Sequence, residues 1–179
     1  MRLIVAADRN WGIGRNNNLL IRIPADMKNF RALTIGKVVI MGRKTLESLP
    51  GGMPLPDRVN IVFTRQDHYS KKGVLAVHSM EELWKEVSCY DTDSIFVIGG
   101  GSIYRMLLPY CDTAYVTRLD YVYEADTCIP DLDKEPGWQL ISRGEEQTCF
   151  DLIYYFDLYR NDRVLSLPPS DPGLSDDKG

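Results

Sequence analysis

The run Ile95-Phe96-Val97-Ile98 constrains the fold most, because it is apolar at every position and leads directly into three glycines. A strand that is apolar at successive positions is typical of a parallel sheet covered by helices on both faces. Comparable runs recur along the chain, separated by short amphipathic segments. We therefore predict strands at residues 3–7, 38–41, 59–64, 74–77, 95–98, 114–119, 138–141 and 151–159.

Short helices are predicted between these strands. Pro24 suits the first turn of a helix, another helix follows Thr45, and a third spans 102–108 and ends before Pro109. The clearest one begins at Ser79, which with Glu82 forms a capping box, and it carries an apolar stripe of Met80, Leu83, Trp84 and Val87. The predicted fold class is α/β: a single domain with a central, mostly parallel sheet of about eight strands, flanked by about four short helices. The last strand alternates plainly and has no helix before it, so we expect an antiparallel C-terminal edge.

One domain suits a chain of 179 residues. We place it at residues 1–162. The tail, residues 163–179, contains Pro168, Pro169, Pro172 and Gly173 and few apolar residues, so we expect it to be disordered.

Composition excludes several classes of partner. The net charge of −4 argues against nucleic acid and anionic membranes, and no apolar run approaches the ~18 residues of a membrane span. The apolar run at the start of the chain is too short for a signal peptide. The thiols and imidazoles show no C-x-x-C pair and no zinc pattern, so we predict no metal and buried, reduced cysteines in a cytoplasmic protein. These residues are Cys89, Cys111, Cys128, Cys149, His68 and His78.

Asp26 is the first candidate functional residue. The helical period that starts at Pro24 places Asp26 on the same side as Phe30 and Leu33, so a carboxylate lies on the apolar stripe. Local sequence alone favours a first-turn acid that the helix dipole stabilises. The alternative is a functional carboxylate, because a carboxylate on an apolar face either neutralises itself or binds a partner.

Three strand ends carry residues suited to phosphate. Gly99-Gly100-Gly101 precedes a helix and lets a ligand approach the backbone, although Tyr104 replaces the last glycine of the dinucleotide fingerprint. The alternative is a simple tight turn between the strand and the helix, but such a turn needs fewer than three glycines. Arg43 and Arg65 follow two other strands and could hold a phosphate monoester, which favours NADP over NAD. Their alternative is a role as solvated surface charges.

Residues 9–22 form a long polar segment with two glycines and an asparagine run. We interpret it as an irregular lid, and the alternative is an ordinary surface loop.

Taken in order, these segments resemble the dihydrofolate reductase family from residue 1 to about 160. The residues that carry the resemblance are Ile13-Gly14, Pro24-Ala25-Asp26 with Phe30, Val39-Ile40-Met41-Gly42-Arg43 with Thr45, Leu55-Pro56 with Arg58, Ile98-Gly99-Gly100-Gly101 with Tyr104, Thr117, and Asp126-Thr127. No single motif is diagnostic, but the ordered set is highly specific.

The resemblance implies roles for many residues. Asp26 would bind the 2-amino group and N3 of a pterin, with Thr117 supporting it, and Arg58 would bind the α-carboxylate of a glutamate tail. Substrate-binding residues would also include Ile4, Val5, Ile21, Met27, Phe30, Leu49 and Ile98. The cofactor would contact Ala6, Ile13, Gly14, Gly42, Arg43, Lys44, Thr45, Thr64, Arg65, Gly99, Gly100, Gly101, Ser102, Ile103, Tyr104 and Thr127, with a cis peptide joining Gly99 to Gly100.

Two positions depart from the family pattern. Leu20-Ile21 stands where the family usually has Pro-Trp, and that tryptophan contacts the substrate and a catalytic water. We expect Ile21 to face the pterin. Ser102 stands where some members carry an arginine near the cofactor phosphates, so phosphate affinity would rest more on Arg43 and Arg65.

The implied activity is NADPH-dependent reduction of 7,8-dihydrofolate to 5,6,7,8-tetrahydrofolate, with hydride transfer to C6 and protonation of N5. The implied protein is a monomer that binds dihydrofolate and antifolate inhibitors. One alternative is another reductase of the same fold, such as the pyrimidine reductase of riboflavin synthesis, which Asp26 together with Arg58 disfavours. The other is a pteridine- or nucleotide-binding protein without catalysis, which only Leu20-Ile21 suggests.

Overall fold

A single large sheet organises residues 1–168, the part of the chain that this computed structural model describes. Its strands lie in the order β10 (Trp138–Arg143), β12 (Leu152–Asn161), β8 (Thr113–Leu119), β1 (Arg2–Ala7), β7 (Ile95–Gly99), β4 (Val38–Gly42), β5 (Val59–Phe63) and β6 (Val74–Val77), and β11 (Gln147–Cys149) pairs with β12. Pairing is parallel from β8 to β6, whereas β12 is antiparallel to β8, β10 and β11. The predicted sheet with its antiparallel C-terminal edge is confirmed, and each of the eight predicted strands is present with its ends shifted by at most two residues.

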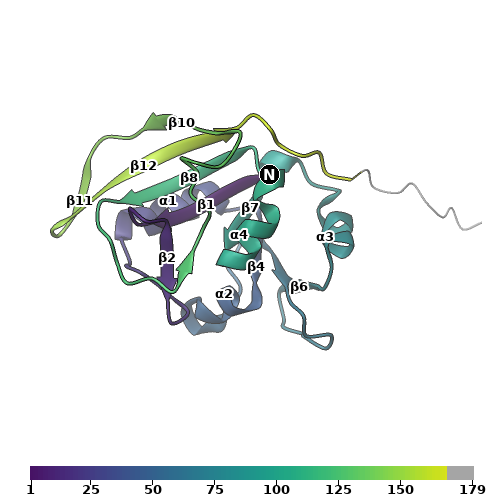
Figure 1. Cartoon of the computed structure of the whole chain (residues 1–179). Helices are drawn as coiled ribbons and strands as arrows, with labels where there is room; N and C mark the ends of the chain where they lie inside the picture. Colours follow the sequence, from purple (N-terminus) through teal and green to yellow (C-terminus); the bar gives the residue numbers. More distant parts are fainter. Residues whose placement is uncertain (169–179) are drawn as a thin grey trace, which may run out of the picture.

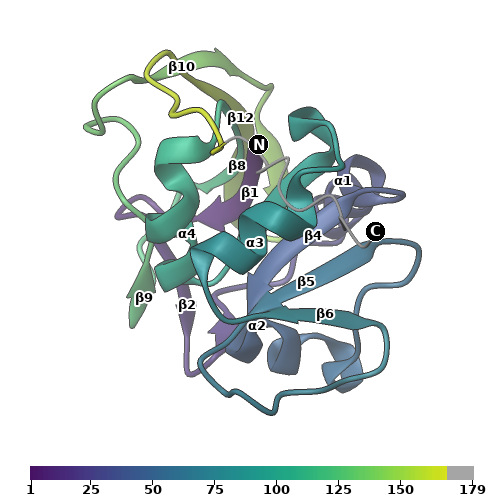
Figure 2. The same ribbon diagram turned by 90° about the vertical axis from the view of Figure 1, so that its right-hand side faces the viewer.

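Helices cover both faces of this sheet (Figures 1 and 2). They are α1 (Pro24–Thr34), α2 (Arg43–Ser48), α3 (Met80–Val87) and α4 (Gly101–Leu107), and 3-10 turns span Pro50–Gly52, Thr92–Ser94 and Leu108–Tyr110. Successive side chains of β1 point to opposite faces. Leu3 and Val5 pack in the cluster that contains α3 and α4, while Ile4 packs in the cluster that contains α1 and α2. Both faces are therefore buried, as the apolar strands predict.

The helix starts differ in how they are capped. Ser79 Oγ accepts from the backbone N–H of Glu82 at 3.1 Å, as the capping box predicts, whereas the Glu82 carboxylate accepts from the N–H of His78. The helix predicted to follow Thr45 begins two residues earlier, at Arg43, so Thr45 lies inside α2 and does not cap it. Gly42 and Gly100 are the N-cap residues of α2 and α4, and neither start has a side-chain cap. Backbone N–H groups therefore remain available at both junctions.

The predicted lid is more ordered than an irregular loop, and that part of the prediction is wrong. β2 (Gly12–Arg15) and β3 (Asn18–Leu19) form a short hairpin, and β2 also pairs with β9 (Thr127–Cys128). Asn16 and Asn17 at its tip have φ angles of 50° and 60°. Asparagine tolerates this left-handed conformation, which two-residue hairpin turns require. The strands are too short to produce an alternating pattern.

Part of the predicted tail contacts the domain. The backbone N–H of Leu165 donates to the carbonyl of Pro109 at 2.8 Å, and Leu167 packs against the main core cluster. The predicted disorder at residues 169–179 lies outside the described residues. The predicted domain limit at residue 162 stays a prediction.

Burial of all four thiols, as predicted, is wrong: Cys111 is buried, but Cys89 is exposed, and all four cysteines are free. No helix within residues 1–168 is long and apolar enough to cross a membrane. The same residues contain no group of three or more His, Cys, Asp or Glu side chains that could hold a metal ion.

Asp8 fixes the lid to the main sheet. Its buried carboxylate accepts backbone N–H bonds from Asn10 at 2.9 Å, Gly12 at 2.8 Å and Tyr123 at 2.9 Å. A Cβ on Gly12 would lie 2.6 Å from that of Ala125, so only glycine allows this close approach. One side chain thus joins the start of the lid to the segment after β8.

We predict that Asp8→Asn lowers the free energy of unfolding by about 1–3 kcal/mol, because the amide turns an N–H group toward one of the three backbone N–H donors that the carboxylate accepts from. Urea unfolding should show a lower midpoint with an unchanged slope. Asp120→Asn is the matched control, since this carboxylate pairs with the exposed Arg9 at the surface, and its midpoint should hardly change. Equal shifts for both variants would contradict the role of Asp8.

Candidate functional site

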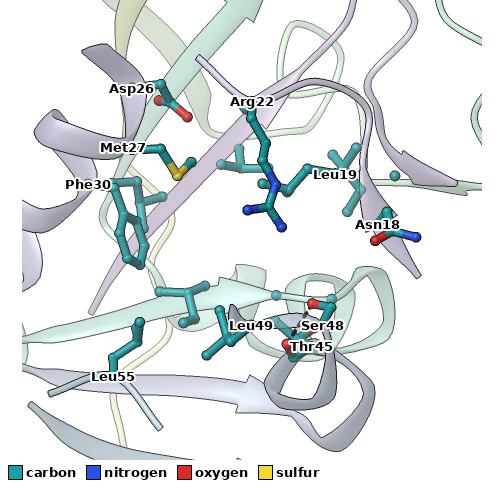
Figure 3. Close-up of a pocket in the computed structure, with 18 of the residues that line it drawn as sticks. Asn18, Leu19, Arg22, Asp26, Met27, Phe30, Thr45, Ser48, Leu49 and Leu55 are labelled. Atoms are coloured by element: carbon teal, nitrogen blue, oxygen red, sulfur yellow. Dashed lines mark hydrogen bonds between the residues drawn. The ribbon is translucent and has the colours of Figure 1, made fainter. Parts of the chain in front are cut away.

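A cleft of about 410 Å³ opens at the carboxyl ends of β1 and β7, between the lid hairpin and helices α1 and α2. Figure 3 shows Asp26, Met27 and Phe30 of α1 on one side, and Leu19 and Asn18 of the lid on the other. Thr45, Ser48 and Leu49 lie below them. The lining is mostly apolar, and its single carboxylate is that of Asp26.

Asp26 is held by a residue distant in the sequence. It lies in the first turn of α1, and its Oδ1 accepts from the hydroxyl of Thr117 on β8 at 2.5 Å. Burial raises the pKa of Asp26 above its ordinary value, and the hydrogen bond from Thr117 opposes this shift. The site therefore presents a desolvated carboxylate with one oxygen oriented and the other able to accept donors.

Arg58 supplies positive charge on the side of Phe30. Its guanidinium carbon lies 5.9 Å from the centroid of the Phe30 ring. Its Nε is buried and has no hydrogen-bond partner among the described residues. Burial lowers the pKa of Arg58, and the nearby Arg31 lowers it further, while Asp57 opposes both. A buried, unsatisfied donor on a cation indicates an anion-binding position.

Asn60 holds the turn that carries Arg58, a role that sequence reasoning missed. Its buried side chain donates to the carbonyls of Leu55 and Arg58 and accepts from the N–H of Leu55. These bonds fix Leu55 and Arg58 against the cleft. A polar residue inside the apolar strand β5 is the one signal that could have identified it.

Three strand ends meet beside the cleft. Gly42 at the end of β4 pairs with Phe63, directly before Thr64, and Met41 pairs with Gly99 of β7. The junctions with Arg43, Arg65 and Gly99–Gly101 therefore lie at one edge, as the sequence suggests. Asn17 of the lid donates to the carbonyl of Lys44 at 3.1 Å, so the lid reaches the same edge.

Glycines let these segments lie close together. A Cβ on Gly100 would lie 3.2 Å from Thr45 Oγ1, and one on Gly101 would lie 2.8 Å from the Thr127 methyl. The peptide bond between Gly99 and Gly100 is cis, as the resemblance implies. Tyr104 donates from its buried hydroxyl to the carbonyl of Ile4 at 2.7 Å, and burial raises its pKa. The backbone at this edge is thus accessible to a ligand.

The structure brings together most of the predicted site residues. Those that line the cleft are Ile4, Val5, Ala6, Ile13, Gly14, Asp26, Met27, Phe30, Thr45, Leu49, Arg58, Ile98, Gly99, Gly100, Tyr104 and Thr127. Thr117 joins them through Asp26. Those that do not line it are Ile21, Gly42, Arg43, Lys44, Thr64, Arg65, Gly101, Ser102 and Ile103.

The residues outside the cleft differ in position. Most lie at the adjoining strand ends, where Arg43 pairs with Glu47 at 2.6 Å and Arg65 is exposed. The side chain of Ile103 belongs to the main core, which leaves only its backbone for a ligand. Their assignment to a cofactor stays a prediction.

The structure does not bring Ile21 to the cleft. Ile21 packs with Ile23 against Leu119 and Tyr154, and the neighbouring Arg22 lines the cleft instead. The expectation that Ile21 faces a bound ring is wrong, because it rested on the family resemblance alone, which does not reveal the direction of a side chain.

Sequence reasoning assigned no site role to several lining residues, most of them on the lid or after α2. They are Arg15, Asn17, Asn18, Leu19, Arg22, Arg31, Ser48, Pro50, Leu55 and Pro56. Of these residues, only Leu55 and Pro56 belong to a motif that the sequence analysis named.

Comparison with known proteins identifies related chains. A family model described as dihydrofolate reductase matches residues 1–161. A dihydrofolate reductase of Staphylococcus haemolyticus is 36% identical over 165 residues, which cover 90% of this chain and 95% of the relative. One from Haemophilus influenzae is 40% identical over 153 residues, covering 83% of this chain and 92% of the relative.

A solved structure shares the fold. The dihydrofolate reductase from Enterococcus faecalis, complexed with NADP(H) and RAB-propyl, aligns with a TM-score of 0.78 and 31% sequence identity. The match covers 90% of this chain and 95% of that chain.

We predict that Asp26→Asn is more stable than the wild type near neutral pH. The raised pKa means that the folded protein binds the Asp26 proton more tightly than the unfolded chain does. Above pH 3.8, the ordinary pKa of this group, ionisation of Asp26 therefore lowers the stability of the folded wild type. The stability advantage of the variant should therefore shrink as the pH falls toward and below 3.8. Urea unfolding at a series of pH values measures this difference, and an advantage that grows toward acid pH would contradict it.

Proposed function

The chain belongs to the dihydrofolate reductase family, and on that premise we propose that it reduces 7,8-dihydrofolate to 5,6,7,8-tetrahydrofolate with NADPH. The observation that carries this proposal is the desolvated carboxylate of Asp26 in an apolar cleft, oriented by Thr117. A flat ring with adjacent N–H donors suits this carboxylate. The 2-amino group and N3 of dihydropterin supply such donors.

Arg58 supports a substrate with an anionic tail. Its buried, unpartnered Nε and its position against Phe30 suit a carboxylate at the end of an aromatic spacer. Asp26 and Arg58 together would hold the two ends of dihydrofolate, with Ile4, Leu49 and Leu55 packing against its rings. Two anchors fix the ring's rotation as well as its depth.

The residues at the glycine-rich edge fit a dinucleotide. The close approach of Gly100 to Thr45, and the uncapped starts of α2 and α4, leave backbone N–H groups for a pyrophosphate. Arg43 and Arg65 would bind the extra ribose phosphate that distinguishes NADPH from NADH, with Thr64 beside them. NADPH, when bound, supplies the hydride.

The protein contributes orientation and control of protons. Asp26 as the anion stabilises positive charge that develops when N5 gains a proton, and the apolar lining strengthens that interaction. Asp26 polarises the pterin, and the proton reaches N5 from water that enters past the lid. The hairpin of β2 and β3 limits how much water enters.

The alternatives fit the site less well. A pyrimidine reductase substrate has no glutamate tail for Arg58. A binding protein without catalysis would not need a desolvated carboxylate beside the glycine-rich edge. We also propose that the protein acts in the cytoplasm, which its free thiols support, and that it acts as a monomer.

Mixing the purified protein with NADPH and dihydrofolate should produce a loss of cofactor absorbance, and Asp26→Asn should slow the hydride step by roughly a hundredfold or more near pH 7. The neutral amide fills the same space but stabilises no positive charge. The variant should recover partly toward pH 5, because solvent then protonates N5 directly.

Asp120→Asn is the control, since it removes a surface carboxylate that does not line the cleft and should keep the wild-type rate at each pH. Near wild-type hydride transfer by Asp26→Asn at pH 7 would remove Asp26 from the mechanism.

Arg58→Gln should raise the KM for dihydrofolate by roughly 10- to 100-fold, since a charged hydrogen bond contributes about 1.5–3 kcal/mol. The substrate 7,8-dihydro-6-methylpterin has no glutamate tail, so its KM should stay near the wild-type value. Steady-state kinetics with both substrates checks this. Equal increases for the two substrates would show that Arg58 supports the cleft rather than the tail.

A further inference from the structure

Arg118 of β8 lies where the lid leaves the main sheet. It pairs in register with Ala7, the last residue of β1, and Figure 1 shows these two strands side by side. Successive side chains of a strand point to opposite faces of the sheet. The neighbouring Thr117 is turned toward Asp26. Arg118 is turned toward the other face, where Trp11 belongs to the main core cluster. One strand therefore reaches the carboxylate of the cleft on one face and the lid on the other.

The guanidinium of Arg118 holds three residues at the start of the lid. Its Nη1 donates to the carbonyl of Asp8 at 2.5 Å, and its Nη2 donates to that of Arg9 at 3.2 Å. Its central carbon lies 3.9 Å from the centroid of the Trp11 ring. Only 13% of the side chain is exposed, and the Asp133 carboxylate lies 3.7 Å from Nη2. A planar guanidinium that stacks on a ring and donates from two nitrogens is fixed in one orientation, and so are its partners.

Trp11 has a backbone conformation that needs such support. Its φ angle is 61°, in a region that bulky residues rarely adopt. Its N–H donates to the carbonyl of Asp8 at 3.0 Å, and its own carbonyl accepts from Ile129 at 3.0 Å. Its ring packs edge-on against Tyr159, with the centroids 5.8 Å apart. A strained residue persists only when its surroundings hold it, and such residues cluster at functional sites. Arg118 contributes the charged contact to these surroundings.

The held segment leads directly into the cleft. Ile13 and Gly14 follow Trp11 by two and three residues, and they line the cleft together with the backbone at Gly99–Gly100. In the proposed function, the cofactor lies at this glycine-rich edge and the acceptor ring lies on Asp26. The lid backbone therefore borders the place where the two rings must meet. A small displacement there slows a reaction strongly, because the reacting atoms need close contact and alignment.

We propose that Arg118 is a positioning residue for hydride transfer. It holds the start of the lid, so that the backbone at Ile13 and Gly14 keeps the cofactor ring against the substrate ring. It touches neither ring and acts through Trp11 and the carbonyls of Asp8 and Arg9. This inference rests on the proposed function.

The test is Arg118→Met, which keeps an apolar stem beside the Trp11 ring and removes the charge and the donors. Amide hydrogen exchange in residues 9–15 should become roughly tenfold faster or more, because a charged hydrogen bond to each of two carbonyls is lost. The hydride step, measured in a single turnover with NADPH and dihydrofolate, should slow by about 10- to 100-fold. The Kd for dihydrofolate should stay near the wild-type value, because Asp26 and Arg58 hold this substrate.

Arg118→Lys is the conservative variant. It keeps a cation near the Trp11 ring and a donor for one of the two carbonyls, so it should restore part of the exchange protection and part of the hydride rate. If the methionine variant does not fold, the lysine variant decides by the same three measurements.

Arg143→Met is the matched control. Arg143 resembles Arg118 in its contacts, because it donates to the buried Asp157 at 2.9 and 2.7 Å and lies 4.9 Å from the centroid of the Tyr155 ring. None of these partners belongs to the lid or lines the cleft. The control should therefore lower the melting temperature while leaving lid exchange and the hydride step unchanged, with all rates measured below the melting temperature of each variant.

Equal slowing of the hydride step in Arg118→Met and Arg143→Met would overturn the proposal, since it would reflect a general loss of stability. Unchanged lid exchange in Arg118→Met would show that Arg118 does not hold the lid. Faster exchange with a wild-type hydride step would remove its positioning role. A wild-type protein that reduces no dihydrofolate would refute the proposed function, and the positioning role with it, whereas the exchange measurement would still show whether Arg118 holds the lid.

Discussion

The burial of the Asp26 carboxylate in an apolar cleft is the constraint on which the functional site of this protein depends. Desolvation opposes ionisation of Asp26, and the hydrogen bond from Thr117 offsets only part of that effect. The folded protein would therefore be more stable if this carboxylate were exposed to water or replaced by a neutral group. Such a site is typical of function, where binding rather than stability determines the residue.

The main sheet provides the framework that makes this site possible. Parallel strands β1, β4, β5 and β7 end at one edge, so the Asp26 cleft and the glycine-rich junctions adjoin each other. A hydride donor and an acceptor ring must lie in contact, and strand ends that meet at one edge give that proximity without a long connection. The lid completes the cleft because Asp8 fixes one end of it and Ile21 and Ile23 fix the other.

Charge is distributed unevenly along the cleft. Asp26 is the one carboxylate in its lining, and the arginines belong to the lid, to α1 and to the turn before β5. This distribution suits a ligand whose ring donates hydrogen bonds and whose distal end is anionic. The unpartnered Nε of Arg58 is consistent with it, because a buried donor without an acceptor costs stability in the folded protein.

Local patterns in the sequence determined the elements. The apolar run of β7, the stripe and cap of α3 and the proline at the start of α1 each depend on neighbouring residues, and they gave the strands, the helices and the fold class. Asp26 was identified as an acid on an apolar face, but local sequence alone favoured an ordinary helix acid. The resemblance of the whole chain to a family, carried by an ordered set of motifs, was needed to assign a function to this residue.

Contacts between distant segments were decided only by the tertiary structure. Thr117 lies 91 residues from Asp26, and no periodicity shows that its hydroxyl points at that carboxylate. The lid hairpin depends on pairing with β9, and the exchange of Ile21 for Arg22 in the cleft depends on which side chains fit against Leu119 and Tyr154. Sequence patterns specify which residues can be buried together, but the direction of a side chain in a short extended segment is set by the packing around it.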